Sequence, residues 1–405
     1  MRAPLPRDMV EATRLTRAGR LSEAVALIQG VLRGGQPSDT PEADARAAAI
    51  ALPPPILELE PAPDGGFSDT PGESVGILAP HLAFGGVFDR LHLNDLDLKG
   101  LGLRGTPGRT APSASEIAPA EGRFIAKSFS SEAGRRLYKL YIPSRHGDEP
   151  RPLIVMLHGC TQSADDFAAG TRMNFAAEEH ACFVVYPEQP AAANASKCWN
   201  WFKRSDQQRG QGEPALIAGI TRQVMRDHRI DARRIYIAGL SAGGAAAAIM
   251  GEAYPDLYAA VGVHSGLACG AARDLPSAFA AMRGNGPLHA STSRARPGER
   301  ALPTIVFHGD RDTTVHPRNG AEVIARAGGR LDAAAERQTV SSGHRYTRSI
   351  QRDAGGRSVL EQWEIHGAGH AWAGGNPAGS FTDPAGPDAS REMLRFFLEH
   401  ARWEA

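Results

Sequence analysis

The sequence has no excess of charge of either sign, few aromatic residues and few cysteines. Its 405 residues include 45 Lys and Arg against 45 Asp and Glu. Without net positive charge the chain is poorly suited to hold a polyanion or an acidic membrane surface, so nucleic-acid-binding and membrane-surface roles are disfavoured. Hydrophobic residues make up 42% of the chain and aromatic residues only 6%, which favours one large domain beside a poorly packed remainder.

Long hydrophobic runs are also missing. No stretch approaches the roughly 18 to 20 consecutive apolar residues that a membrane-spanning helix needs. The N-terminus contains basic side chains but no apolar run of about 7 to 15 residues followed by small residues. We therefore expect no membrane span and no secretory signal, which makes the cytoplasm the expected compartment.

The cysteines are too sparse for a disulfide framework, and none of them has C-x-x-C metal spacing. They are Cys160, Cys182, Cys198 and Cys269. We expect ordinary thiols and no metal site. A pairing of Cys160 with Cys198 requires that the fold bring the two together.

The first 120 residues differ in character from the rest. Residues 1–34 have apolar side chains at helical intervals, with a break at Gly19, and predict an amphipathic helical segment. Residues 35–120 are rich in Pro, Gly and Ala, and twelve of the 29 prolines lie between residues 33 and 120. Such a stretch buries too little apolar surface to offset its ordering entropy, so we expect a mostly disordered linker. This N-terminal region is the candidate site of contact with a partner or a granule.

From residue 121 to residue 405, short apolar runs alternate with helix-length segments. The runs are PLIVMLHG, ACFVVYP, RRIYIAGL, YAAVGVHSG and LPTIVFHGD, and helices are expected near residues 166–180, 213–228 and 242–254. Near-continuous apolar strands indicate burial on both faces, which is typical of a parallel sheet covered by helices. The expected class is α/β, with a mostly parallel, doubly wound sheet.

Ser241 follows one of these apolar runs, in the sequence Gly239-Leu240-Ser241-Ala242-Gly243. Ligands bind outside the carboxyl ends of the strands in such a sheet. A G-x-S-x-G pattern between a strand and a helix is typical of a nucleophile on a sharp, strained turn that the glycines permit. We expect Ser241 to be a nucleophile, the alternative being a helix N-cap serine.

A serine nucleophile needs an orienting acid, which follows the serine along the chain in this fold. The run LPTIVFHGDRDTTVHP offers Asp310 and Asp312. Asp310 lies where the chain turns off the strand, a position often used for the turn itself. We favour Asp312, since the apolar Val315 nearby suggests that this loop packs down.

The base is a histidine that follows the acid, and VLEQWEIHGAGHAW offers His366 and His370. Gly367 and Gly369 preclude a stable helix, so this pair is not a helical zinc site. The glycine-rich loop before His370 suits a side chain that reaches across the strand ends, and we assign His370 as the base. The rivals, less suited by chain order, are His158, His264, His308 and His316.

An oxyanion hole needs two N–H donors close to the nucleophile. We expect these to be the backbone N–H of Ala242, directly after Ser241, and that of Cys160, in the loop after PLIVML. Aromatic side chains near these motifs are expected to form an apolar wall for the substrate, with ordinary core packing as the alternative. They are Trp199, Trp201 and Trp372.

Seven segments occur in order between about residues 135 and 400: LHGCTQSADDF, YPEQP, CWNWF, GLSAGG, VHSG, HGDRDTTVHPRNG and GAGHAW. In these the chain resembles the polyhydroxybutyrate (PHB) depolymerase family of α/β-hydrolase esterases, which extends to feruloyl and acetylxylan esterases. The resemblance supports Ser241, Asp312 and His370 as a triad, with Cys160 at the oxyanion strand end and no cofactor. In that family the LHGC and CW segments lie beside the pocket, which is compatible with Cys160 meeting Cys198.

The resemblance implies a serine esterase that forms an acyl-enzyme, with poly(3-hydroxybutyrate) or short 3-hydroxyalkanoate oligomers as the expected substrate. One alternative is a feruloyl or acetylxylan carbohydrate esterase. Another is a catalytically inactive, granule-associated scaffold whose working part is the N-terminal region. Secreted family members that degrade granules carry a signal peptide and a further substrate-binding domain, whereas only about 35 residues follow His370 here. Attack on crystalline polymer is thus not expected, and an extracellular location follows from the resemblance alone.

Overall fold

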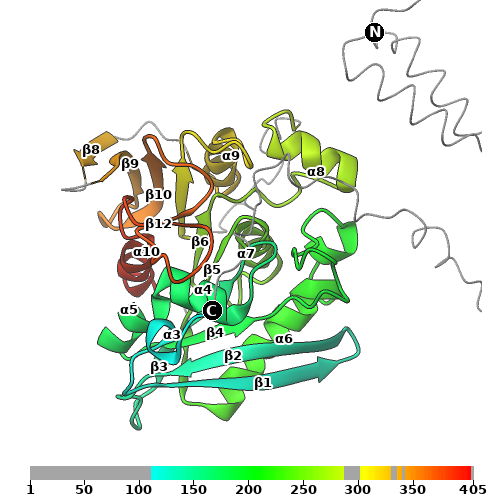
Figure 1. The fold of residues 1–405 in the computed structure, drawn as a ribbon, viewed down its shortest axis with the longest axis vertical. Helices are drawn as coiled ribbons and strands as arrows, with labels where there is room; N and C mark the ends of the chain where they lie inside the picture. The colour runs from blue at the N-terminus through cyan, green and yellow to red at the C-terminus, as the bar shows by residue number, and fades with distance from the viewer. Residues whose placement is uncertain (1–110, 287–301, 330–334, 340–342, 403–405) are drawn as a thin grey trace, which may run out of the picture. The chain divides into compact units, whose positions relative to one another are not determined.

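The computed structural model describes residues 111–286, 302–329, 335–339 and 343–402 (Figure 1). The predicted helical segment 1–34 and most of the predicted linker 35–120 lie outside these residues. The described chain begins with helix α3 (Ala114–Ile117), where Ile117 is buried and its carbonyl accepts a hydrogen bond of 2.9 Å from Asn174 Nδ2. The predicted domain start at residue 121 is therefore too late, because α3 already packs on the domain.

The described domain is built on a ten-stranded sheet with the order β1-β2-β4-β3-β5-β6-β7-β10-β9-β8. The strands are β1 (Arg123–Ser131), β2 (Gly134–Ile142), β3 (Arg151–Leu157), β4 (Phe183–Pro187), β5 (Ile230–Leu240), β6 (Ala260–His264), β7 (Thr304–Gly309), β8 (Ala335–Thr339), β9 (Arg345–Arg352) and β10 (Ser358–Ile365). Strands β4, β3, β5, β6, β7 and β10 are parallel, and an antiparallel pair extends each edge. The predicted mostly parallel sheet is confirmed.

The apolar runs of the sequence form the centre of this sheet. Every residue of β4, β6 and β7 is buried, as their continuous apolar sequences predict. The outer strands β1 and β9 carry more polar residues and remain partly exposed. Parallel strands therefore lie inside and antiparallel strands at the edges, where one face can meet water.

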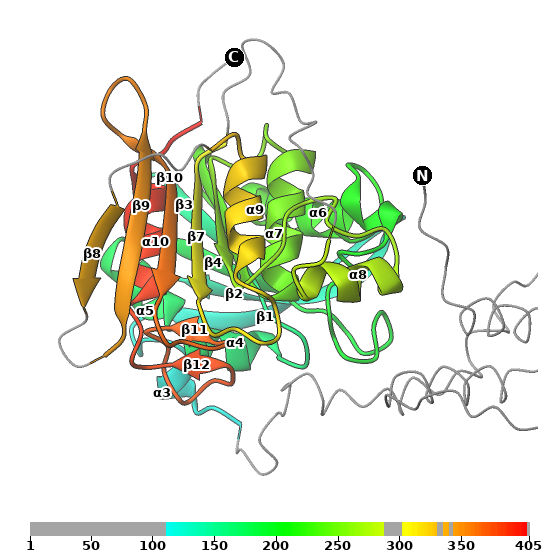
Figure 2. The same cartoon turned by 90° about the horizontal axis from the view of Figure 1, so that it is seen from above.

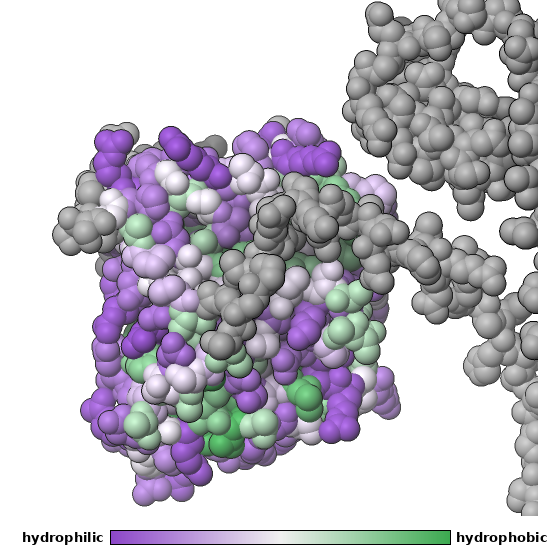
Figure 3. All heavy atoms as spheres, viewed as in Figure 1, coloured by the Kyte–Doolittle hydropathy of each residue, from purple (hydrophilic) through white to green (hydrophobic). Residues whose placement is uncertain are grey.

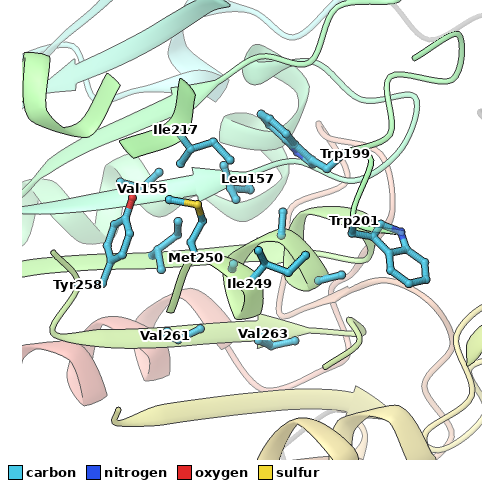
Figure 4. Packing of buried hydrophobic residues seen from close by; sticks show 14 of the residues in the cluster. Val155, Leu157, Trp199, Trp201, Ile217, Ile249, Met250, Tyr258, Val261 and Val263 are labelled. Atoms are coloured by element: carbon cyan, nitrogen blue, oxygen red, sulfur yellow. The ribbon is translucent and has the colours of Figure 1, made fainter. Parts of the chain in front are cut away.

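Helices cover both faces of the sheet (Figure 2). One face carries α6 (Gly212–Asp227), α7 (Ala242–Ala253), α8 (Leu275–Met282) and α9 (Arg318–Arg326), and the other carries α4 (Ala164–Thr171), α5 (Met173–Glu179) and α10 (Ala389–Leu398). A short 3-10 helix, η3 (Arg204–Gln207), precedes α6. Each face has its own hydrophobic cluster, and Figure 4 shows the one beneath α6 and α7. The fold is doubly wound, as predicted.

The helix predicted over residues 166–180 is two helices. Arg172 ends α4 and begins α5 in the left-handed conformation, with φ of 52°. Its guanidinium lies 3.8 Å from the centroid of the Phe175 ring, a cation–π contact. The apolar periodicity of this segment continues through the break, which explains why the sequence predicted one helix.

The face of the molecule in Figure 3 is mostly hydrophilic, with hydrophobic residues in small patches. Leu137 and Leu275 are the exposed large hydrophobic residues of the described part. No helix within the described ranges has the length and hydropathy required to cross a bilayer.

Candidate active site

Ser241 lies between β5 and α7, at the carboxyl end of the sheet. Its φ of 57° and ψ of −118° place it in a backbone region that non-glycine residues rarely adopt. The Ser241 N–H donates a hydrogen bond of 2.9 Å to the carbonyl oxygen of His264, the last residue of β6. Local strain at a strand-to-helix turn is the geometry that the G-x-S-x-G pattern predicts.

The two motif glycines allow α7 to approach the end of β3. A Cβ at Gly243 would lie 2.0 Å from the carbonyl oxygen of Leu157 and 2.6 Å from that of His158. A Cβ at Gly239 would lie 2.3 Å from the carbonyl carbon of Gly243. Backbone atoms cannot move aside as flexible side chains can, so any larger residue would push the helix from the sheet. The glycines thus bring the start of α7 against the residues that follow β3.

Asp312 and His370 meet across the ends of β7 and β10. His370 Nδ1 donates a hydrogen bond of 2.7 Å to Asp312 Oδ2, and the side chains are 8% and 0% exposed. This bond leaves Nε2 as the free ring nitrogen of His370. Neither Nε2 nor Ser241 Oγ makes a hydrogen bond to any described residue, and such contacts in free enzymes often tighten only when substrate binds.

The Asp312 carboxylate is fully enclosed by donors. Oδ1 accepts the backbone N–H groups of Thr314 and Val315, both at 2.9 Å, and His308 Nε2 lies 3.4 Å from Oδ2. Burial alone would raise the pKa of Asp312, but the nearby His308 ring and the hydrogen bond from His370 outweigh it and hold the pKa well below its usual range. Asp312 therefore stays ionised beside His370.

The rival candidates Asp310 and His366 form a second pair. His366 Nδ1 lies 3.0 Å from Asp310 Oδ2, and Asp310 Oδ1 accepts the Gly367 N–H at 2.7 Å. These side chains are about one-third exposed, 33% for His366 and 31% for Asp310. The pair connects the loops that carry Asp312 and His370, which is a structural use of the residues that the sequence left as alternatives.

The other histidines near the strand ends have their own partners. His158 Nε2 accepts the Gln189 N–H at 3.0 Å, and burial lowers the His158 pKa to about 4. His264 Nε2 accepts the Ala373 N–H at 2.9 Å, while His308 Nε2 donates to the Val315 carbonyl at 2.8 Å. Chain order made these three histidines less suited as the base, and in the structure each one instead makes a hydrogen bond to a backbone group.

The two predicted oxyanion donors are free in the part of the chain that the structure describes. The N–H groups of Cys160 and Ala242 donate no hydrogen bond there, and Ala242 begins α7, where a helix leaves its first N–H groups without internal partners. The neighbouring N–H groups are in use: Gly159 donates to Gln162 Oε1 at 2.9 Å, and Thr161 donates to the Ser196 carbonyl at 2.7 Å. Cys160, which lies between these two residues, keeps its donor available.

Gln162 fixes the turn that presents Cys160, although the sequence did not single it out. It is 2% exposed, and its Nε2 donates to Asp166 Oδ2 at 2.9 Å and to the Ser380 carbonyl at 3.1 Å. Asp166 Oδ1 also accepts the Ser380 N–H at 2.9 Å. The turn after β3 is thereby connected to the segment that follows His370. A buried glutamine in LHGCTQ is the signal that could have revealed this role.

A disulfide joins Cys160 to Cys198, across 38 positions of the sequence. The expectation of ordinary thiols is therefore wrong for these two residues, because the fold places the LHGC turn against the CW segment. Cys182 and Cys269 are buried free thiols, as expected.

The predicted aromatic wall is corrected for two of its three members. Trp199 is 0% exposed, and its Nε1 donates to the His158 carbonyl at 3.1 Å. Trp372 is 1% exposed and packs at right angles to Phe167. Both are core residues, because their large rings fill the space beneath the strand ends. Trp201, at 6% exposure, lies at the margin of the cluster in Figure 4 and remains the candidate for substrate contact.

Two surface hollows of about 430 Å³ each lie beside α5 and α10, and neither is lined by Ser241, Asp312 or His370. Within the described ranges, no group of three or more His, Cys, Asp or Glu side chains is arranged to hold a metal ion.

A family model described as Esterase PHB depolymerase matches residues 136–345, more than half of the chain. The poly(3-hydroxyalkanoate) depolymerase C of Paucimonas lemoignei is 32% identical over 229 residues, which cover 54% of this chain and 54% of the relative. A probable acetylxylan esterase A of Aspergillus clavatus is 29% identical over 196 residues, 45% of this chain and 62% of the relative. The chain thus spans about half to two-thirds of the length of these relatives.

Among solved structures, the acetyl xylan esterase from Aspergillus awamori superimposes with a TM-score of 0.54 and 18% identity, covering 68% of this chain and 99% of that one. At this identity the likeness concerns the fold, which is that of an α/β-hydrolase. The family match covers the sequence from β2 to the start of β9, which includes Ser241 and Asp312. The chain belongs to the PHB depolymerase family of esterases.

Proposed function

We propose that this chain is a serine esterase in which Ser241 is the nucleophile, His370 the general base and Asp312 the carboxylate that orients the histidine. The observation that carries the proposal is the 2.7 Å hydrogen bond from His370 Nδ1 to the buried Asp312, at the same end of the sheet as the strained Ser241 turn. No metal or organic cofactor takes part in the proposed reaction.

In the acylation step, Ser241 Oγ attacks the carbonyl carbon of the ester while its proton passes to His370 Nε2. The C–O bond to the alcohol then breaks, and the leaving oxygen takes the proton from His370. Asp312 keeps the proton of Nδ1 in place and stabilises the imidazolium that forms between the two transfers.

In the deacylation step, a water molecule attacks the acyl carbon and gives its proton to His370 Nε2. The bond to Ser241 Oγ breaks, and Oγ recovers a proton from the histidine. The products are a carboxylic acid and an alcohol, and the enzyme returns to its starting state. The N–H groups of Cys160 and Ala242 would hold the negative oxygen in both tetrahedral intermediates.

The proposed substrate is poly(3-hydroxybutyrate) or a short 3-hydroxyalkanoate oligomer. This choice is supported by the 32% identity to a poly(3-hydroxyalkanoate) depolymerase, against 29% for the acetylxylan esterase of Aspergillus clavatus. The second candidate is a carbohydrate esterase acting on acetylated xylan or feruloyl esters. It is favoured by the feruloyl esterase B of Neurospora crassa, which is 27% identical over 208 residues.

The disulfide between Cys160 and Cys198 bears on the compartment. Disulfides form and persist mainly in oxidising environments outside the cytosol. We therefore propose that the enzyme works in an oxidising compartment, in place of the cytoplasm that the N-terminal sequence led us to expect. Counting free thiols in protein isolated from its source under alkylating conditions tests this, since two free thiols are expected and four would contradict it.

Labelling with a fluorophosphonate probe tests the reaction class. Ser241 should label and the Ser241→Ala variant should not, with ester hydrolysis falling by several orders of magnitude. Turnover of 3-hydroxybutyrate oligomers, methyl ferulate and acetylated xylan, measured side by side, then separates the two substrate classes. Wild-type protein that neither labels nor hydrolyses any of these would favour the scaffold alternative, in which the N-terminal region contacts a partner or granule.

A further inference from the structure

His264 is the one described residue that bonds both to the nucleophile and to the segment that follows the base. It ends β6, is fully buried, and pairs in register with Leu240 of β5 and Phe307 of β7. The proposed mechanism gives it no part in proton transfer. Its contacts nevertheless reach the main chain of Ser241 and the segment that begins after His370.

The main chain of His264 reaches the nucleophile. Its carbonyl oxygen accepts the Ser241 N–H at 2.9 Å. Ser241 lies in a strained conformation, and strained residues persist only where surrounding contacts hold them. This bond is such a contact, and it comes from the strand next to the one that carries the serine.

The side chain of His264 reaches the other way, toward the base. Nε2 accepts the Ala373 N–H at 2.9 Å, three residues beyond His370. Because Nε2 accepts this bond, the proton of the neutral ring is on Nδ1, which lies 3.1 Å from Ser265 Oγ. Burial, together with nearby His308 and His370, lowers the pKa of His264 to about 3, and Nε2 therefore remains an acceptor at neutral pH.

The imidazole ring also stacks with two aromatic rings. The Trp372 ring lies with its centroid 5.0 Å away and its plane inclined by 25°, and the Phe307 ring lies at 5.8 Å and 11°. Trp372 is two residues from His370 along the chain. A ring packed against two others and bonded at both nitrogens has one orientation, so the segment bonded to it is fixed as well.

We infer that His264 is a positioning residue that sets the separation and orientation of Ser241 and His370. The inference rests on the proposed esterase function, and it concerns the geometry of the reacting groups, since His264 itself touches neither substrate nor transferred proton. A misplacement of about 1 Å can cost roughly 10²-fold in rate. Loss of the side-chain contact should therefore reduce kcat far more than it changes KM.

The test uses two substitutions at His264 in the full chain. His264→Leu fills the site but removes the acceptor for Ala373 N–H, and we expect kcat on a p-nitrophenyl ester to fall by roughly 10²-fold. KM should stay within about threefold, and the rate of fluorophosphonate labelling should fall with kcat. His264→Gln places an amide oxygen near the position of Nε2, and its kcat should be at least about tenfold higher than that of His264→Leu.

His400→Leu is the matched control. His400 is also buried, also makes one backbone hydrogen bond, of 2.8 Å to Ser358, and also packs on an aromatic ring, that of Phe396. Ser358 begins β10, so these contacts lie at the opposite end of the strand from His370. His400→Leu should lower the melting temperature about as much as His264→Leu and leave kcat within about threefold of wild type.

Three results would overturn the inference: kcat of His264→Leu within threefold of wild type, a His264→Gln variant no more active than His264→Leu, or a His264→Gln variant that fails to fold. The last would show that His264 acts on folding. Failure of the proposed function is recognised separately, because wild type would then not be labelled and Ser241→Ala would hydrolyse the ester as fast as wild type.

Discussion

The loops that carry Asp312 and His370 are held by hydrogen bonds to charged groups, whereas the turn that carries Cys160 is held by a disulfide, an amide side chain and main-chain hydrogen bonds. On the first side, which we call the base side (residues 310–317 and 366–371), the backbones also pair, with Asp310 N–H donating to Ile365 and Arg311 N–H to Ala368. The second, which we call the oxyanion side (residues 158–163), is held by Gln162, by the disulfide to Cys198 and by the Thr161 N–H, which donates to Ser196.

This difference follows from the task of each side. The base side must stabilise a positive charge that appears on the imidazole, so its carboxylate has to be ionised as well as correctly placed. The oxyanion side offers only a neutral N–H group, which needs a fixed position and no particular charge. A substitution that keeps the shape of a side chain but removes its charge should therefore lower kcat strongly on the base side and only slightly on the oxyanion side.

The largest expected effect is that of Asp312→Asn. The amide is nearly the same shape, but it no longer holds the proton on His370 Nδ1 or balances the imidazolium, so kcat should fall by about 10⁴-fold. Asp310→Asn is the matched control on the same loop, and its kcat should stay within about threefold. Equal losses in the two variants would show that the buried pair has no special role.

Gln162→Met should lower kcat by roughly tenfold with a smaller change in KM. The variant keeps the volume of the side chain but frees the Gly159 N–H, so the turn that presents Cys160 is no longer fixed, and part of an oxyanion-hole contribution is lost. Gln223→Met serves as control, because Gln223 bonds to Ser128 and Tyr138 on the outer strands. A kcat for Gln162→Met equal to that of the control would argue that Cys160 needs no support from this side chain.

Removing the disulfide should affect stability more than rate. In a Cys160→Ser, Cys198→Ser double variant we expect unfolding free energy to fall by about 3 to 4 kcal/mol, as for a loop of this length, and kcat to fall by only about threefold. Urea unfolding and steady-state kinetics measure the two effects. Dithiothreitol should reproduce them in wild type and leave the double variant unchanged, and a response of the double variant would point to another target.

The smallest expected effect concerns acid stability. Because folding lowers the pKa of Asp312, the unfolded chain binds more protons near pH 4, and the stabilisation is present above the ordinary aspartate pKa and lost as pH falls. Asp312→Asn should therefore flatten the fall in unfolding free energy between pH 5 and 3. The Asp310 pKa is lowered too, but its carboxylate is partly exposed, so Asp310→Asn should flatten it less. A larger flattening in Asp310→Asn than in Asp312→Asn would contradict the expectation that the more buried carboxylate contributes more to acid stability.

Much of the fold was predictable because its central strands are continuous apolar runs. The outer strand β9, with the sequence RYTRSIQR, has no such run, and nothing in those residues predicted a strand. The helix break at Arg172 could not be predicted either, because tertiary contacts and not local propensity determine that this arginine adopts the left-handed conformation. Edge strands and helix breaks depend on contacts with residues far away in the sequence, which hydrophobic periodicity does not reveal.

For the candidate site, chain order and motif spacing selected Ser241, Asp312 and His370, which the structure places at the carboxyl ends of the strands β5, β7 and β10. They did not reveal that Trp199 and Trp372 are core residues, because an aromatic residue beside a motif looks the same whether it faces substrate or packing. The support from Gln162 and His264 was missed as well, although both lie in segments that carried the family resemblance. Their roles depend on partners more than one hundred residues away.

The stack of Trp372 on the His264 ring also provides an optical probe. Its indole is buried and lies two residues from His370, so any movement of that loop would change the surroundings of the fluorophore. With the other tryptophans replaced by phenylalanine, its emission would report motion of the loop in real time, without an added label. Substrate binding and release could then be timed separately from hydrolysis.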